Sequence, residues 1–271
     1  MDSSTAPRRN TIVVVTGAGT GIGRATARAF AAEGAHVLAV GRRAEPLDET
    51  AAGHNRITPL AADITADGGP ELIIRTALET HGRLDVLVNN AGIVRSGALG
   101  TLEPETIVPQ IATNLIATNL IAPILLAQAA LPSLEASGGV IVDVSTSVGQ
   151  RAWPGSSVYA ATKTALESLT RSWAVELAPR GVRVVAVAPG AIDTPTAAAH
   201  GDHRPSLVEE YATADDARPP VSHPGPGRQD RPVLPSRVRG LLVALAGGRV
   251  VGGVTAAVVA GQAQVVRRER V

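Results

Sequence analysis

The chain has 271 residues, with 25 basic and 24 acidic side chains and a formal net charge of +1. No strong global field therefore favours nucleic acid or an anionic membrane as a partner. The absence of cysteine excludes disulfides, thiolate catalysis and cysteine-ligated metal. Hydrophobic residues make up 45% of the chain but aromatic residues only 2%, so Ala, Val, Leu and Ile must fill the core, as in parallel sheets buried on both faces.

The N-terminal segment 1–9 lacks the apolar core of a signal peptide, and we expect it to be a disordered leader. No unbroken apolar run reaches the roughly 18 residues that a membrane span needs. We therefore expect a cytoplasmic protein that has no membrane partner and no metal site.

Short β-branched runs alternate with helical patterns up to about residue 195. Strands are predicted over residues 11–16, 36–40, 57–61, 84–89, 140–144 and 182–188. Helices are predicted over residues 23–33, 72–80, 104–133 and 157–178. This alternation, with short links that contain glycine, indicates right-handed βαβ units. The expected fold is α/β, a Rossmann-type doubly wound parallel sheet in a single domain over residues 10–271.

A glycine-rich turn, TGAGTGIG at residues 16–23, joins the first strand to the first helix. Gly17 permits a tight turn, Gly21 lets the backbone approach a pyrophosphate, and Gly23 lets the helix pack closely on the strand. An ordinary glycine-rich βα turn is the alternative, and the position between strand and helix favours dinucleotide binding.

A basic pair, Arg42 and Arg43, follows the second strand about twenty residues later. An acid at this point would bind the ribose 2′-hydroxyl of NAD, whereas arginine suits the 2′-phosphate of NADP. We expect NADP, with NAD as the alternative. A solvated basic pair on a surface loop is the competing interpretation.

Tyr159 and Lys163 are four residues apart on a predicted helix, so both lie on one helix face. A free tyrosine, with a pKa near ~10, is a poor base at neutral pH. A neighbouring ammonium favours the phenolate and lowers that pKa towards the working range. The pair is therefore the predicted proton-transfer site.

These motifs, together with Asn89-Asn90-Ala91-Gly92 after the fourth strand, resemble the short-chain dehydrogenase/reductase family. The resemblance covers residues 10–199 and is strongest to members that are 3-oxoacyl-reductase-like. It implies an NAD(P)-dependent oxidoreductase that interconverts a carbonyl and a secondary alcohol, with tyrosine as the general acid and base. The cofactor-binding residues that it implies are Gly17, Thr20, Gly21, Ile22, Gly23, Arg42, Arg43, Asp63, Ile64, Asn90, Ala91, Gly92, Tyr159, Lys163, Pro189, Gly190, Ile192 and Thr194.

The family places a substrate-binding hydroxyl thirteen residues before the tyrosine, which selects Thr146, with Ser147 as the alternative. It also places a catalytic asparagine in the long helix. Here the pentapeptide IATNL occurs twice in tandem, at residues 111–115 and 116–120. Counting from Asn90 selects Asn114, whereas counting back from Tyr159 selects Asn119. The sequence after residue 121 is in register with Asn119, which is therefore our choice.

Residues 200–271 depart from the family pattern. A substrate lid could survive at residues 206–212, but a stretch rich in Pro and Arg follows. Residues 254–262 faintly resemble the terminal strand of the family. A shifted reading frame over about residues 213–253 is one explanation, and a family-like alternative frame in the gene would support it.

The expected protein is a short-chain dehydrogenase/reductase that acts on a small carbonyl or alcohol, as a homodimer or homotetramer. A cofactor-binding protein with little or no catalysis is the second hypothesis, because of the atypical C-terminal region. An epimerase or dehydratase that shares the Tyr/Lys pair is a third and ranks below both.

Overall fold

The sheet of the computed structural model has seven strands in the order β3-β2-β1-β4-β5-β6-β7. The structure describes residues 11–94, 97–101, 103, 105, 109–146, 155–189, 194 and 257–260, without side chains at 109, 110, 112–114 and 257–260. The strands are β1 (Ile12–Thr16), β2 (His36–Gly41), β3 (Ile57–Ala61), β4 (Val86–Asn89), β5 (Val140–Val144), β6 (Arg183–Ala188) and β7 (Ala257–Ala260). The first six pair in parallel, which confirms the predicted doubly wound sheet. Strand order reverses between β1 and β4, the place where such sheets bind ligands.

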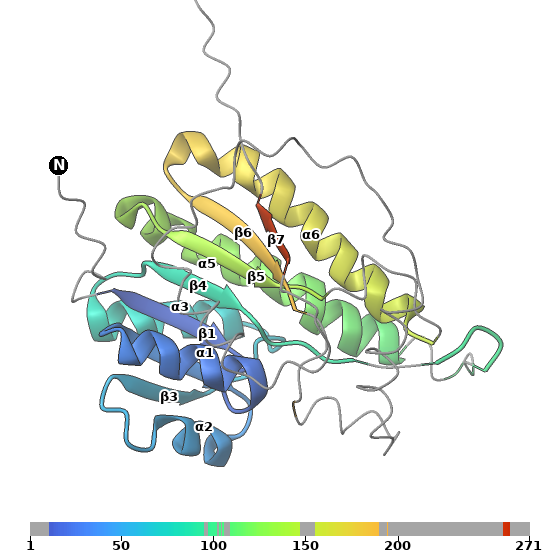
Figure 1. Ribbon diagram of the computed structural model, residues 1–271, viewed down its shortest axis with the longest axis horizontal. Helices are drawn as coiled ribbons and strands as arrows, with labels where there is room; N and C mark the ends of the chain where they lie inside the picture. Colours follow the sequence, from blue (N-terminus) through green and yellow to red (C-terminus); the bar gives the residue numbers. More distant parts are fainter. Residues whose placement is uncertain are drawn as a thin grey trace, which may run out of the picture.

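Helices cover both faces of this sheet (Figure 1). They are α1 (Gly21–Ala32), α2 (Ala44–Ala51), α3 (Gly69–His81), η1 (Pro109–Ile121), α5 (Ala122–Ser137), α6 (Ser157–Leu177) and the short 3₁₀ turn η3 (Ala178–Arg180). Gly34, at φ +93°, follows the end of α1 as its position predicts. Helix α2 was not predicted from the sequence.

Two apolar clusters lie on opposite faces of the sheet, because alternate residues of a strand point to opposite faces. Val13 and Val15 of β1 pack with Phe30 of α1 on one face. On the other face, Leu87 of β4 and Ile141 of β5 pack with side chains of α3, α5 and α6. The helices on the second face carry Asn119, Tyr159 and Lys163, which are described below.

The helix that contains the tandem pentapeptide is not a regular α-helix over its first part. All 13 residues of η1 are π-helical, and α5 continues the same helix to Ser137. In a π-helix residue i bonds to residue i+5, so equivalent residues of the two copies lie one wide turn apart. The predicted single helix over residues 104–133 is therefore wrong in geometry, and it ends four residues later. Both copies of the pentapeptide thus lie within the π-helical segment.

The stretch Leu115–Ser137 of this helix is long and apolar enough, by length and composition, to cross a membrane. Polar residues such as Asn119 interrupt it, so it contains no unbroken apolar run of that length. Its buried residues Leu126, Ala130 and Leu134 pack in the cluster on the sheet. A core helix that is covered on one side meets the same criteria as a membrane span.

Strand β7 is the exception to the parallel sheet, since it pairs with β6 in antiparallel register (Figure 1). Val185 is paired with Ala260 and Ala188 with Ala257. Residues 254–262 thus contain a strand, as their resemblance to the terminal strand suggested. The possible lid at 206–212 and the stretch 213–253 lie outside the described residues.

Deleting residues 111–115 leaves a single IATNL copy, and we expect it to convert η1 to a regular α-helix. Because π-helices longer than one turn are rare, the deletion should stabilise the protein. A gain of roughly 1 kcal/mol in the free energy of unfolding would raise the thermal midpoint by about 2–4 °C. Circular dichroism melting measures this shift. A matched deletion of residues 124–128 removes the buried Leu126 and must lower the midpoint. A comparable loss for both deletions would show that the second copy is needed for folding.

Candidate active site

The glycine turn between β1 and α1 has a backbone that only glycine adopts easily. Gly17 and Gly21 have φ values of +65° and +52°. A Cβ atom on Gly17 would lie 2.8 Å from Cα of Ala91, and one on Gly23 would lie 2.5 Å from Nδ2 of Asn90. The turn therefore packs directly against the segment after β4, with no room for side chains at Gly17 and Gly23.

Hydrogen bonds join the same two segments. The backbone N–H groups of Asn90 and Ala91 donate to the Thr16 hydroxyl, at 3.1 and 3.0 Å. The Thr16 hydroxyl donates to the carbonyl oxygen of Val88 at 3.2 Å, and Nδ2 of Asn90 donates to the carbonyl oxygen of Thr16 at 2.8 Å. The ends of β1 and β4 are thus fixed to each other at the point where strand order reverses.

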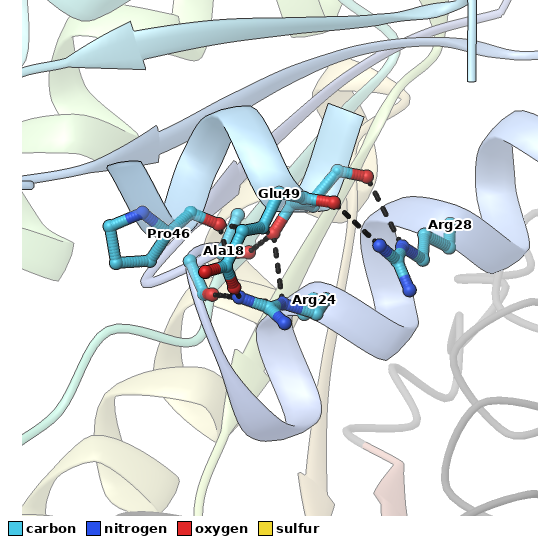
Figure 2. Close-up of polar contacts among 7 residues, drawn as sticks. Ala18, Arg24, Arg28, Pro46 and Glu49 are labelled. Atoms are coloured by element: carbon cyan, nitrogen blue, oxygen red, sulfur yellow. Dashed lines mark hydrogen bonds and ion pairs between the residues drawn. The ribbon is translucent and has the colours of Figure 1, made fainter. Parts of the chain in front are cut away.

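Arg24 of α1, which the sequence analysis did not select, holds the glycine turn from its other side. Figure 2 shows its guanidinium between the turn and α2. It donates from Nε to the carbonyl oxygen of Gly19 at 2.9 Å and to the Thr50 hydroxyl at 3.1 Å, and from Nη2 to the carbonyl oxygen of Pro46 at 3.2 Å. Thr50 in turn donates to the carbonyl oxygen of Ala18 at 2.9 Å. Helix α2 therefore supports the turn.

Arg42 and Arg43 lie between β2 and α2, and both are exposed. Asp63 and the buried Ile64 follow β3, the neighbouring strand. Burial by itself raises the pKa of Asp63, but hydrogen bonds from the backbone and hydroxyl of Thr65 and the charge of Arg42 lower it overall. The predicted adenosine-binding residues therefore lie at one edge of the sheet, with Arg42 close enough to act on Asp63.

Lys163 is buried, although it carries an ammonium group. It lies one turn after the half-buried Tyr159 on α6, and its Nζ donates to the carbonyl oxygen of Val144 at 2.7 Å. A Cβ atom on Gly92 would be 3.3 Å from that Nζ and 3.4 Å from Oδ1 of Asn119. Three segments far apart in the sequence thus meet around Gly92.

Asn119 is buried and makes three hydrogen bonds through its amide. Its Oδ1 accepts from N–H of Ile93 at 2.9 Å, and its Nδ2 donates to the carbonyl oxygen of Ile93 at 2.9 Å and to the Thr162 hydroxyl at 3.2 Å. Thr162 donates to the carbonyl oxygen of Tyr159 at 2.8 Å. Asn119 is therefore tied both to the segment after β4 and to the tyrosine turn of α6. The side chain of Asn114 lies outside the described residues.

Thr146 lies two residues after the end of β5 and is half-buried. Its neighbour Ser145 is held by α6, since its hydroxyl donates to Oε1 of the buried Glu167 at 2.6 Å. Glu167 lies one turn after Lys163 on α6. Ser147, the alternative substrate-binding hydroxyl, lies outside the described residues.

The segment after β6 is described only at its two ends. Pro189 is buried, and Thr194 lies beside the glycine turn, 3.1 Å from where a Cβ on Gly21 would be. Gly190 and Ile192 lie outside the described residues. Thr194 and the glycine turn are therefore neighbours.

The sequence analysis missed a carboxylate on β5, next to Val144, the residue that Lys163 contacts. Asp143 of β5 is fully buried, accepts from Nδ2 of Asn89 at 2.9 Å and from the Thr170 hydroxyl at 2.8 Å. Burial raises its pKa to about 6, although those hydrogen bonds and the charge of Lys163 oppose the rise. The signal in the sequence was an acid inside the otherwise apolar run VIVDV.

Among the described residues no group of three or more His, Asp or Glu side chains is arranged to hold a metal ion. The polar side chains here instead form hydrogen-bonded pairs between β4, β5 and α6. These hydrogen bonds connect the carboxyl ends of β4 and β5 to α6.

The stability of the protein should depend on pH through Asp143. Because its pKa is raised on folding, the stabilisation present below about pH 4 is lost as pH rises through about 6. Asp143→Asn has no such dependence. We expect the difference in unfolding free energy between wild type and Asp143→Asn to shift by about 2 kcal/mol in favour of wild type from pH 7 to pH 4.5. Urea titrations at the two pH values measure it, and parallel curves would contradict the raised pKa.

Several named proteins are similar to the chain over 68–76% of its length. A 3-oxoacyl-[acyl-carrier-protein] reductase from Thermotoga maritima is 35% identical over 189 residues, which is 68% of this chain and 75% of the relative. A 2-(R)-hydroxypropyl-CoM dehydrogenase from Xanthobacter autotrophicus is 38% identical over 190 residues, again 68% and 75%. A 3beta-hydroxysteroid dehydrogenase from Mediterraneibacter gnavus is 35% identical over 212 residues, 76% and 75%.

Solved structures share the fold. A 3-ketoacyl-(acyl-carrier-protein) reductase from Brucella melitensis, complexed with NADH, superposes with a TM-score of 0.68 at 29% identity, covering 75% of this chain and 82% of that one. A short-chain dehydrogenase/reductase from Caenorhabditis elegans, solved with cofactor, also gives 0.68, at 37% identity and with coverage of 76% and 79%.

The family model for short chain dehydrogenases matches residues 11–205. This range contains the glycine turn, the Asn119 helix and the Tyr159–Lys163 pair, and it ends where the sequence departs from the family pattern. The chain belongs to the short-chain dehydrogenase/reductase family and is an NAD(P)-dependent oxidoreductase.

Proposed function

We propose that the protein interconverts a ketone or aldehyde and the corresponding alcohol, with Tyr159 as the general acid and base. The observation that carries this proposal is the convergence of Lys163 and Asn119 around Gly92, one helical turn from Tyr159. A buried ammonium and a buried amide have no structural need to meet there, but proton transfer at Tyr159 needs both a fixed charge and a fixed polar path.

The residues of the glycine turn fit a dinucleotide. Gly17 and Gly23 leave no room for side chains, and Thr20, the N-cap of α1, makes no side-chain hydrogen bond to the helix. The first N–H groups of α1 are thus not capped by Thr20 and can bind a phosphate. Gly92, beside Lys163, would border the nicotinamide ribose. When bound, the cofactor supplies or accepts the hydride.

We propose NADP as the preferred cofactor and NAD as the alternative. The exposed guanidinium groups of Arg42 and Arg43 stand at the end of β2, where a ribose 2′-phosphate would lie. A bidentate arginine pair suits a phosphate better than a hydroxyl. The Asp63 carboxylate, which feels the charge of Arg42, lies on the adjacent strand end and would border the adenine.

In the reduction direction, Tyr159 would donate its phenolic proton to the carbonyl oxygen of the substrate. The Lys163 ammonium would lower the pKa of that phenol and bind the ribose. Thr146 would orient the substrate oxygen through its hydroxyl. Asn119 would steady the proton path, because its amide is fixed on both sides by Ile93 and Thr162.

The three relatives are named for an acyl thioester, a coenzyme M thioether and a steroid, so we propose a small carbonyl or alcohol without choosing among these classes. We also propose a cytoplasmic homodimer or homotetramer built as a single domain over residues 10–271. The antiparallel β7 favours one alternative, a cofactor-binding protein with impaired catalysis, because the C-terminal edge of the sheet departs from its parallel pattern.

Tyr159→Phe removes the phenolic hydroxyl and should lower kcat by at least about 100-fold, since general acid–base catalysis contributes 10²–10⁴-fold. Cofactor binding should be unchanged. Fluorescence titration with NADPH and NADH measures binding, and a panel of ketones, 3-oxoacyl thioesters and hydroxysteroids measures turnover. Tyr211→Phe changes the other tyrosine, in the possible lid at 206–212, and shows how much of the loss is specific to Tyr159. Full activity in Tyr159→Phe would refute the assignment, and binding without turnover in wild type would favour the alternative.

A further inference from the structure

We propose that Asp143 is a positioning residue. It is the buried counter-ion that keeps the ammonium of Lys163 protonated, one helical turn from Tyr159. The proposal rests on the role proposed above for Lys163, and it adds a carboxylate that acts through that lysine without touching substrate or cofactor.

The position of Asp143 follows from the period of the strand. Ile141 and Asp143 are two residues apart on β5, so both face α5 and α6, and Leu87 and Asn89 of β4 do the same. Asn89 and Asp143 are direct partners in the parallel register, which explains their hydrogen bond. One face of the sheet thus changes from apolar to polar where β4 and β5 approach their carboxyl ends.

Both oxygens of the Asp143 carboxylate are hydrogen-bonded, one to Asn89 and one to Thr170. This arrangement holds a charged carboxylate in a place with no access to solvent, because donors replace the lost water. The charges of Lys163 and Asp143 each favour the ionised form of the other group.

Lys163 is the only lysine in the 271 residues, whereas the other basic side chains are arginines. It reaches from α6 to β5, where its Nζ bonds to the carbonyl oxygen of Val144, the residue next to Asp143. Burial lowers the pKa of Lys163 to about 8, and the Asp143 charge opposes that decrease. Without the carboxylate, the ammonium would lose its proton at a still lower pH.

The other ionisable groups around this pair are few among the described residues. Tyr159 and Glu167 lie on α6 with Lys163, and Glu167 accepts the hydrogen bond of Ser145. The facing residues of β4 and η1, Asn89 and Asn119, are neutral amides. Asp143 is fully buried beside Val144, whose carbonyl oxygen Lys163 contacts, and its charge raises the pKa of Lys163 against the effect of burial.

Asp143→Asn tests the proposal because it removes the charge and can keep both hydrogen bonds. The Thr170 hydroxyl also contacts the carbonyl oxygen of Leu166 at 2.9 Å. It can donate there and accept from the new amide, since a hydroxyl is both donor and acceptor. The side chain of a single lysine gives one signal, so protein labelled with [ε-¹³C]lysine reports the pKa of Lys163 by NMR without assignment.

We expect the Lys163 midpoint in Asp143→Asn to fall by about one pH unit or more relative to wild type. The alkaline limb of kcat/KM should move with it, giving about a tenfold loss near pH 9 and little change near pH 6. Asp85→Asn is the matched control. Asp85 is equally buried, but it pairs with Arg83 and with the N–H of Ile12 at the amino end of β4, so its removal should leave the Lys163 midpoint unchanged.

An unchanged Lys163 midpoint in a folded Asp143→Asn protein would overturn the proposal, and so would an equal shift in Asp85→Asn. If Asp143→Asn does not fold, the wild-type signal decides. It should show a second inflection near pH 6, as Asp143 ionises, and a single inflection would refute the coupling. These outcomes are independent of Tyr159→Phe, so the role of Asp143 can fail while the proposed function stands.

Discussion

The site depends on a change of polarity along one face of the sheet. Leu87 and Ile141 lie in the apolar cluster beneath α5 and α6, and two residues further along their strands Asn89 and Asp143 replace them. Polar groups buried at this depth are stable only when hydrogen-bonded. They therefore fix the adjoining helices, above all α6, and so the lysine and tyrosine that α6 carries. The hydrogen bonds that stabilise these buried polar groups thus also position the site residues of α6.

Local patterns predicted the strands well, because buried parallel strands are short apolar runs whose length and composition are distinctive. The glycine turn was predicted for the same reason, as Gly17 and Gly21 adopt conformations that other residues avoid. Helix α2 was missed because its short, largely polar sequence has no clear apolar period. The contacts of Arg24 with α2 and the pairing of Asp143 with Asn89 were missed because both join elements distant in sequence.

The tandem pentapeptide shows how spacing alone can mislead. Counting forward from Asn90 selects Asn114, whereas counting back from Tyr159 selects Asn119. Each count matches the family spacing on its own side of the duplication. The structure includes both copies in a wide helix and buries Asn119, which contacts Ile93 and Thr162. Asn119 remains our choice, because it is in register with α5, which is held against the sheet by Leu126 and Leu134. Because these buried side chains hold α5 on the sheet, an insertion before α5 does not change the register of α5 against the sheet.

The central claim is that the buried Lys163 ammonium makes Tyr159 acidic enough to exchange a proton near neutral pH. The sequence contains two tyrosines, so in Tyr211→Phe the phenolate absorbance in the near ultraviolet arises from Tyr159 alone. A pH titration of that variant should give a midpoint clearly below the ordinary value of ~10, which Lys163→Met should raise. A midpoint at or above the ordinary value, unaffected by Lys163→Met, would contradict the account.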